Sequence, residues 1–511
     1  MKHLGKFLGN SLLIWSLCLL SLLSLASIFY RTQLPMDGSE LAVIQKNGLI
    51  FWAGLVVFAL LLWVLIHFLL ELDASHLLIG GFIFYAVVGL FLIFHQNNLP
   101  RHDALAVLEV ARAVNRNEFS PLTSLNGYIF KYPHQLGLVT FERGVLAVFG
   151  QANTQVFFYI NLLFALADNY LLYLLAKRQF PKTRVGKITV ILSFLFLPQI
   201  FYILFVYGLT YSILFALLGL LFLQSYFQHR RLVSVGLALI SVTVAYLLRS
   251  NNLLLLLSIV VVLFLDYLQN HYAKSLIVAA TVLIVPMGAS KLVTYSYQAQ
   301  TGVTLEGEPK IAWVAMGLDD NPIYNRIPGW YDAYLETVYT EHQGNAKAIK
   351  RASQQKIKER IQYMRQNPLY TIQFFKNKFL STWTDSLFQS VWSGPLPRSK
   401  VEGQKVEGET MASLYKGGAI WKNIYLYSAG LLTVIYICSI VGVGEVMRQR
   451  QGVTIVLVIL TYLSAGFLFH LIWETKSQYV YPYIYMLLPL AALGVDRLYR
   501  RTKGDSSEEK I

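Results

Sequence analysis

The sequence predicts an all-α protein that crosses a membrane many times. Of its 511 residues 55% are hydrophobic and only 14% are charged, whereas about 25% are charged in an ordinary soluble domain. Mean hydropathy is +0.50. Apolar runs of about 20 residues recur, which is the length a helix needs to cross the hydrocarbon layer. The run at 253–265 does not alternate in polarity, so a membrane β-barrel is not predicted.

The formal net charge of +15 is explained better by membrane topology than by nucleic-acid binding. The basic residues cluster at the ends of apolar runs, where the positive-inside rule places them on the cytoplasmic side. No nucleic-acid partner is therefore expected. The two cysteines, Cys18 and Cys438, lie inside apolar runs and are expected to be ordinary core residues.

The hydropathy pattern predicts about twelve spans, with both chain termini in the cytoplasm. The expected spans are 11–30, 49–70, 77–95, 153–176, 188–207, 210–228, 233–248, 253–268, 275–292, 424–444, 454–472 and 483–495. Segment 135–150 is left out because Glu142 and Arg143 lie in its middle, where charges are costly in lipid. Counting it as a span would also move the basic residues at 177–187 outside. It is therefore expected to be a juxtamembrane helix.

These assignments divide the chain into six parts. The expected parts are N-terminal transmembrane helices 1–96, an outside loop with juxtamembrane helices 97–150, central transmembrane helices 151–293, an outside region 294–422, C-terminal transmembrane helices 423–499 and a cytoplasmic tail 500–511. Within the outside region, 345–366 has helix-forming composition, and 369–388 is rich in Phe, Lys and Trp and is expected to be an interfacial helix.

The polar stretch 97–150 carries the motifs that point to a function. Asp103 opens an amphipathic segment, Tyr132-Pro133 follows a turn-rich linker, and Phe149-Gly150 ends the stretch. With these features the chain resembles the GT-C superfamily of integral membrane glycosyltransferases, and is most similar to bacterial relatives of the protein O-mannosyltransferases (glycosyltransferase family 39). The resemblance implies a GT-C-like helical bundle whose first large outside loop starts with an acidic residue.

Two later features add to the resemblance. Arg249 stands at the outer end of a predicted span, and 474–482 (ETKSQYVYP) follows another. Many relatives carry Arg-Tyr in this second place, where the present chain has Gln478-Tyr479. That difference leaves open how position 478 affects donor recognition.

The resemblance implies a polyprenyl-phosphate sugar as donor and a cell-envelope polysaccharide, lipid or protein as acceptor. Transfer would occur on the outer face of the cytoplasmic membrane, among membrane lipids. A rival interpretation is a polytopic transporter or flippase of lipid-linked envelope precursors. A third is a non-catalytic envelope assembly protein on the same scaffold.

Asp103 is the expected catalytic carboxylate, either as general base or as ligand of a divalent cation such as Mg²⁺ or Mn²⁺. The alternative is a carboxylate that only stabilises a helix N-terminus through the helix dipole. Glu109 should face about 240° away on the same helix. Asp319 and Asp320 form an acidic pair that is a weaker candidate for a metal site, because adjacent loop aspartates are usually solvated.

Arg249 and Lys476 are the candidates for binding the donor phosphate, since a guanidinium matches phosphate oxygens in pairs. A snorkelling interfacial arginine is the alternative for Arg249. The candidates for substrate binding are Tyr132, His134, Gln135, Glu474 and Tyr479. A helix-start role for 132–135 and an aromatic belt at 479–483 explain the same residues without function.

Asp168 and Asn169 lie inside a predicted span, where a carboxylate suggests a function by default. A structural hydrogen bond to another helix is expected instead. Asp332 and Glu336 are four residues apart and would share a face of one helix. The chain has no phosphate-binding loop of the GxxxxGK[ST] type and no HExxH motif, so neither an ATP-driven pump nor a zinc protease is expected.

Overall fold

The computed structural model describes residues 1–37, 39–97, 100–321, 327–394, 405–449 and 455–503. Helices make up most of this chain, joined by two small antiparallel sheets. The protein is an all-α, multi-pass membrane protein, as the hydropathy predicts. Of the predicted tail 500–511, the part from 504 onward lies outside the described residues.

Nine helices in the described part of the chain are long and apolar enough to cross a membrane. They are α1 (Lys2–Phe29), α2 (Leu49–Leu69), α3 (Ala74–Phe94), α8 (Gln155–Gln179), α11 (Gly208–His229), α13 (Leu253–Asn270), α14 (Lys274–Thr301), α20 (Ala419–Gln449) and α21 (Ile455–Ile472). All nine coincide with predicted spans.

The predicted span 188–207 is not one straight helix. Helix α9 (Val185–Leu195) ends, and α10 (Pro198–Phe201) and η2 (Tyr202–Leu204) continue at an angle of 49°. Pro198 explains the break, because proline lacks the N–H and its ring collides with the preceding turn. Counted as one bent span, this pair raises the number among the described residues to ten.

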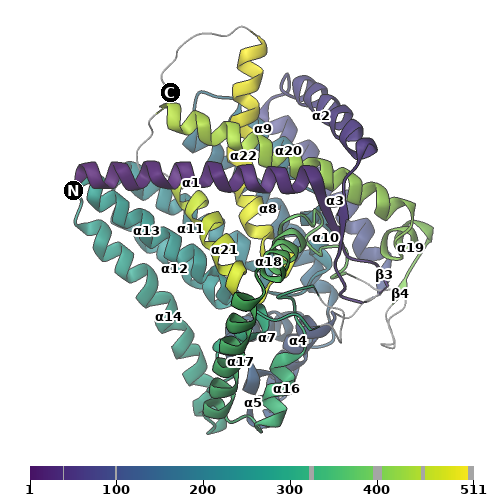
Figure 1. The fold of residues 1–511 in the computed structure, drawn as a ribbon, viewed down its shortest axis with the longest axis vertical. Coiled ribbons are helices and arrows are strands. Elements are labelled where there is room, and N and C mark those ends of the chain that lie inside the picture. Colours follow the sequence, from purple (N-terminus) through teal and green to yellow (C-terminus); the bar gives the residue numbers. More distant parts are fainter. Residues whose placement is uncertain (38, 98–99, 322–326, 395–404, 450–454, 504–511) are drawn as a thin grey trace.

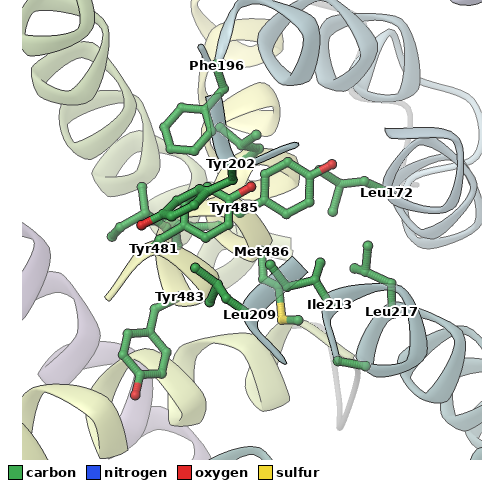
Figure 2. Close-up of a cluster of buried hydrophobic side chains, with 14 of the residues drawn as sticks. Leu172, Phe196, Tyr202, Leu209, Ile213, Leu217, Tyr481, Tyr483, Tyr485 and Met486 are labelled. Atoms are coloured by element: carbon green, nitrogen blue, oxygen red, sulfur yellow. The ribbon is translucent and has the colours of Figure 1, made fainter. Parts of the chain in front are cut away.

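The other two predicted spans are α12 (Leu232–Leu248), which is short, and α22 (Tyr481–Thr502). Every residue of α22 from Tyr481 to Asp496 is buried, so α22 is the central helix of the bundle (Figure 1). Figure 2 shows Tyr481, Tyr485 and Met486 of α22 among aromatic and aliphatic side chains of neighbouring helices. A helix that is apolar on all sides must lie in the core.

The remaining elements connect or cap the spans, and all but α17 (Ala346–Gln366), a polar helix of 21 residues, are shorter than 17 residues. The helices are α4 (His102–Asn115), α5 (Ser120–Thr123), α6 (Tyr128–Lys131), η1 (Pro133–Gln135), α7 (Leu136–Phe149), η3 (Ser250–Asn252), α15 (Ile311–Gly317), α16 (Tyr334–Glu341), α17 (Ala346–Gln366), α18 (Pro368–Trp383), α19 (Glu409–Tyr415) and η5 (Ser477–Tyr479). Strand β1 (Tyr30–Gln33) pairs with β2 (Val43–Lys46), and β3 (Gln96–Asn97) pairs with β4 (Lys405–Val406).

The segments predicted to lie outside meet at one end of the bundle, which we call the site end. Figure 1 shows α4, α7, α16 and α17 gathered there. The β1–β2 hairpin is tied to α18 because the Thr32 hydroxyl donates to the Leu380 carbonyl, at 3.2 Å. The loop before α15 is tied to α6 because the Glu308 N–H donates to the Lys131 carbonyl, at 3.0 Å.

The opposite end of the bundle carries the basic residues that set the predicted topology. Lys187 donates to the carbonyl of Leu70 at 3.1 Å, and Gln269 donates to the carbonyl of Gly5 at 2.9 Å. These bonds close the ends of α2 and α1 against neighbouring helices.

A buried lysine joins three elements at the site end. Lys378 of α18 is 1% exposed. Its ammonium donates to the carbonyls of Leu471 at 3.1 Å and Trp473 at 2.9 Å, and to the carbonyl of Gly317. These carbonyls end α21 and α15, where helices leave acceptors unsatisfied. Three N–H donors thus meet three acceptors, which offsets part of the cost of burying the charge; burial still lowers the pKa of Lys378 to about 7.

Replacing Lys378 by Met should lower the stability of the purified protein by about 3 kcal/mol, because three buried carbonyls lose their donor. Thermal unfolding in detergent measures the change. Lys376→Met is the control, since Lys376 is an exposed lysine on the same helix. Equal melting temperatures for the two variants would show that Lys378 does not join these elements.

Candidate functional site

The segment 473–479 between α21 and α22 is held in place along its backbone. The Glu474 N–H donates to the Trp313 carbonyl at 3.2 Å, and the Thr475 N–H donates to the Gly329 carbonyl at 2.9 Å. Gly317 lies so close that a Cβ there would come within 2.3 Å of the Trp473 carbonyl carbon. Only glycine permits this approach, so α15 rests directly on the segment.

Side-chain hydrogen bonds also hold the segment 473–479 in place. The Ser477 hydroxyl donates to the Asp385 carboxylate at 2.6 Å. Asp385 is 2% exposed and also accepts the N–H groups of Leu387 and Gln389, each at 3.1 Å. Asp385 is therefore a positioning residue of the segment, with all its hydrogen bonds inside the protein.

Asp103 lies in the first turn of α4 and its side chain is open to solvent. Desolvation by the surrounding protein nevertheless raises the pKa of its carboxyl; Glu40 and Glu336 raise it further, whereas Lys476 lowers it. Solvent access together with a dense protein environment describes a carboxylate in a recess of the surface. A raised pKa makes the ionised carboxylate a stronger base.

Lys476 brings distant parts of the chain together beside Asp103. Its ammonium pairs with Glu40 at 2.8 Å and lies 5.4 Å from the ring centre of Tyr331. Burial lowers the pKa of Lys476, but Glu40, Glu474 and Asp103 outweigh burial and raise it. The lysine is therefore a fixed positive charge among three carboxylates.

Arg249 lies between two tyrosine rings. Its guanidinium carbon is 5.8 Å from the ring centre of Tyr207 and 5.7 Å from that of Tyr479. Its Nη1 is buried and has no hydrogen-bond partner, and within the described ranges no carboxylate pairs with Arg249. A half-buried guanidinium with an unpartnered N–H group and no carboxylate beside it is a candidate site for an anion.

Aromatic rings line the side of the site next to α6. The rings of Tyr132 and His134 lie 6.0 and 6.2 Å from Trp313, which stacks on Trp473 at 6.3 Å. His134 is exposed to solvent, while the protein packed around it and the nearby Lys310 lower the pKa of its ring. Gln135 donates to the hydroxyl of Tyr207, which connects η1 to the ring beside Arg249.

Glu474 is 4% exposed, and its carboxylate accepts a hydrogen bond from the Tyr479 hydroxyl at 3.5 Å. Burial raises the pKa of Glu474 to about 7, with Lys476 acting in the opposite direction. Glu474 is therefore a buried residue of the site. It accepts the hydrogen bond of Tyr479 and contributes negative charge beside Lys476.

The structure thus brings most predicted site residues together. Asp103, Lys476, Glu474 and Tyr479 affect each other's pKa, and Arg249 contacts Tyr479. Tyr132, His134 and Gln135 are neighbours in the chain, and Gln135 bonds to Tyr207, whose ring contacts Arg249.

Asp319 and Asp320 belong to a different part of the site end. Asp319 pairs with Lys356 and Arg360 of α17, and Asp320 pairs with Arg360 at 2.9 Å. Both carboxylates thus serve to hold α17. Among the described residues, no three His, Cys, Asp or Glu side chains are placed to hold a metal ion together, and a divalent cation at Asp103 stays a prediction.

Asp168 lies elsewhere in the structure, and Asp332 does not lie on the helix predicted for it. Asp168 is 1% exposed within α8, and its Oδ1 has no partner, whereas Asn169 accepts a hydrogen bond from Tyr485 at 2.8 Å. The expected interhelical bond is thus made by Asn169. Asp332 precedes α16 and accepts the Tyr334 N–H at 2.9 Å, so it shares no helix face with Glu336.

Glu40 and Glu308 were not predicted. Glu40 lies in a loop between the first two spans, and nothing in its local sequence distinguishes it from a solvated loop carboxylate. Glu308 stands in a Gly-Glu-Pro turn, and Gly307 has φ +68° with Pro133 packed against it. The sequence Gly-Glu-Pro indicates a turn but not that Glu308 is buried.

No family model matches the chain, and neither a characterised protein nor a solved structure matches it significantly.

The raised pKa of Glu474 predicts a pH dependence of stability. A carboxyl whose pKa rises from 4.5 to about 7 on folding binds more protons folded than unfolded. It therefore costs stability progressively between about pH 4.5 and 7, up to about 3 kcal/mol. Glu474→Gln should remove that part of the loss.

The measurement is the change in melting temperature between pH 5 and pH 8, for wild type and Glu474→Gln. Glu409→Gln is the control, because Glu409 is exposed. The variant should lose less stability than the control over this interval. The same loss in both would mean that Glu474 is ionised at no cost in the folded protein.

Proposed function

We propose that the protein is a GT-C-type glycosyltransferase that moves a sugar from a polyprenyl-phosphate donor to a cell-envelope acceptor on the outer face of the cytoplasmic membrane. One observation carries the proposal: the half-buried guanidinium of Arg249, whose Nη1 has no partner, and the solvent-open carboxylate of Asp103 lie in one site, joined by Lys476 and Tyr479. An anion-binding group and a base at the end of a membrane-spanning bundle suit an anionic lipid-linked donor.

The reaction is an inverting displacement. An acceptor hydroxyl oxygen attacks the anomeric carbon and forms the new glycosidic bond. The bond from that carbon to the phosphate oxygen breaks, and the polyprenyl phosphate leaves with the electron pair. Asp103 takes the proton of the hydroxyl, either directly or through a bound water.

Arg249 stabilises the departing phosphate. The guanidinium would donate to a phosphate oxygen as negative charge grows there, and in a partly desolvated site this interaction is strong. The rings of Tyr207 and Tyr479 already fix the guanidinium, so little reorganisation is needed. Lys476 adds positive charge while Glu40 keeps it in position.

Transport of lipid-linked precursors is the second candidate, and Asp168 is the observation that favours it. A carboxylate oxygen without a partner inside a spanning helix suits a coupled transporter. Asp168 is, however, only 1% exposed, whereas transport requires an accessible pathway beside it. The site around Asp103 is open to solvent, which favours the transferase.

Replacing Asp103 by Asn should lower sugar transfer by about 100-fold or more, because the general base is lost. Envelope glycans and lipid-linked sugars are compared in cells with the wild-type protein, a deletion or Asp103→Asn. One sugar substituent should disappear in both mutants, while its polyprenyl-phosphate donor accumulates.

Glu109→Gln is the matched control, since Glu109 is an exposed carboxylate of the same helix, paired with Arg112; it should retain transfer. Unchanged glycans in the deletion would contradict the transferase and favour transport or envelope assembly. Loss in the deletion but not in Asp103→Asn would move the base to another carboxylate.

A further inference from the structure

A second pair of carboxylates, Glu308 and Glu336, lies beside Tyr132. Glu308 is 7% exposed, and both of its carboxylate oxygens are buried without a hydrogen-bond partner. Glu336 accepts the Tyr132 hydroxyl at 3.4 Å through Oε1, while its Oε2 is buried and unpartnered. Burying such groups without partners costs free energy, and a ligand that donates hydrogen bonds to them would lower that cost.

The two carboxylates lie close enough to influence each other. Burial raises the pKa of Glu308 to about 8, and the charge of Glu336 contributes, while Lys131 acts in the opposite direction. Lys131 does not neutralise the pair: its ammonium lies 4.7 Å from the ring centre of Tyr339, and in the described chain neither glutamate forms an ion pair. With a pKa of about 8, Glu308 is mostly protonated at pH 7 in the free protein, and a positively charged ligand would favour its ionised form.

Partly exposed side chains, among them aromatic rings, border the buried carboxylate oxygens. Tyr132, Tyr331, Trp313 and Glu336 are all partly exposed. Tyr132 contacts Trp313 at 6.0 Å, and ring faces attract organic ammonium groups. A bare divalent cation needs about six oxygen ligands, and no suitable group of three carboxylate, His or Cys ligands exists in the described chain.

We propose that Glu308 and Glu336, with Tyr132 and Trp313 beside them, bind the primary ammonium group of a ligand. Glu336 is also coupled to Asp103, whose pKa it raises, so the ammonium group would be held next to the base. If the protein transfers sugars as proposed above, the ligand is the acceptor, which is then an amine-bearing envelope molecule. That last step rests on the proposed function, whereas the ammonium site does not.

Binding of small amines to the purified full-length protein tests the site without donor or turnover. The probes are glucosamine and ethanolamine, and their uncharged counterparts are N-acetylglucosamine and ethylene glycol. Calorimetry should give at least about tenfold tighter binding for an amine than for its counterpart, because hydrogen bonds to charged groups are the stronger ones. Binding of glucosamine alone would identify an amino sugar, and binding of both amines an ammonium group on either carrier.

Glu308→Gln keeps the size of the side chain and prevents its ionisation when the amine binds, and should weaken amine binding about tenfold or more. Glu306→Gln is the control, because Glu306 is an exposed carboxylate two residues away. Without ligand, Glu308→Gln should melt no lower than Glu306→Gln, which verifies folding. Lower melting would reveal a missed partner of Glu308 and overturn the proposal.

Three other results would overturn the ammonium site: equal binding of amines and their counterparts, unchanged amine binding by Glu308→Gln, or binding of Mg²⁺ or Mn²⁺ in place of amines. If the purified protein binds amines as expected but deleting it leaves the glycans of the cell unchanged, the ammonium site stands. Only its assignment to a sugar acceptor is then rejected.

Discussion

The site depends on the buried ammonium group of Lys378. Its hydrogen bonds to the carbonyls of Gly317, Leu471 and Trp473 join the ends of α15 and α21 to α18. The segment 473–479 begins at this junction and carries Glu474, Lys476 and Tyr479. If the junction moved, Lys476 would leave Glu40 and Tyr479 would leave Arg249. A charge that is costly to bury is retained here because it fixes the start of the segment that assembles the site.

Charged groups of both signs lie near Asp103. Arg249, beside Tyr479, has an unpartnered guanidinium nitrogen, and Glu40 holds the positive charge of Lys476 in place. Glu308 and Glu336 have buried carboxylate oxygens without a partner. Asp103 is open to solvent, and its pKa responds to both Lys476 and Glu336. If the protein transfers sugars as proposed, Arg249 and Lys476 would face the anionic donor, and the two glutamates a positively charged acceptor.

Hydropathy predicted the class of fold and most spans, because crossing a membrane imposes a length and a composition that local sequence must carry. Hydropathy predicted neither the break at Pro198 nor the central position of α22, because both depend on how the helices pack. Asp103, Arg249 and Lys476 were predicted from motifs and from their places at span ends. Their partners were not: Glu40 meets Lys476 across more than four hundred residues of chain, and Glu308 is distinguished only by being buried without a partner. Such convergence depends on tertiary structure, which local patterns do not contain.

The most direct test of the central claim is the binding of a polyprenyl phosphate, without sugar, to the purified protein. Wild type is compared with Arg249→Gln, and with Arg116→Gln as control, since Arg116 is an exposed arginine at the same end, paired with Glu118. The account predicts that Arg249→Gln binds at least about tenfold more weakly, because a charge-assisted hydrogen bond is lost, while the control binds like wild type. Equal affinity for all three proteins would contradict an anion site at Arg249, and with it the proposed donor.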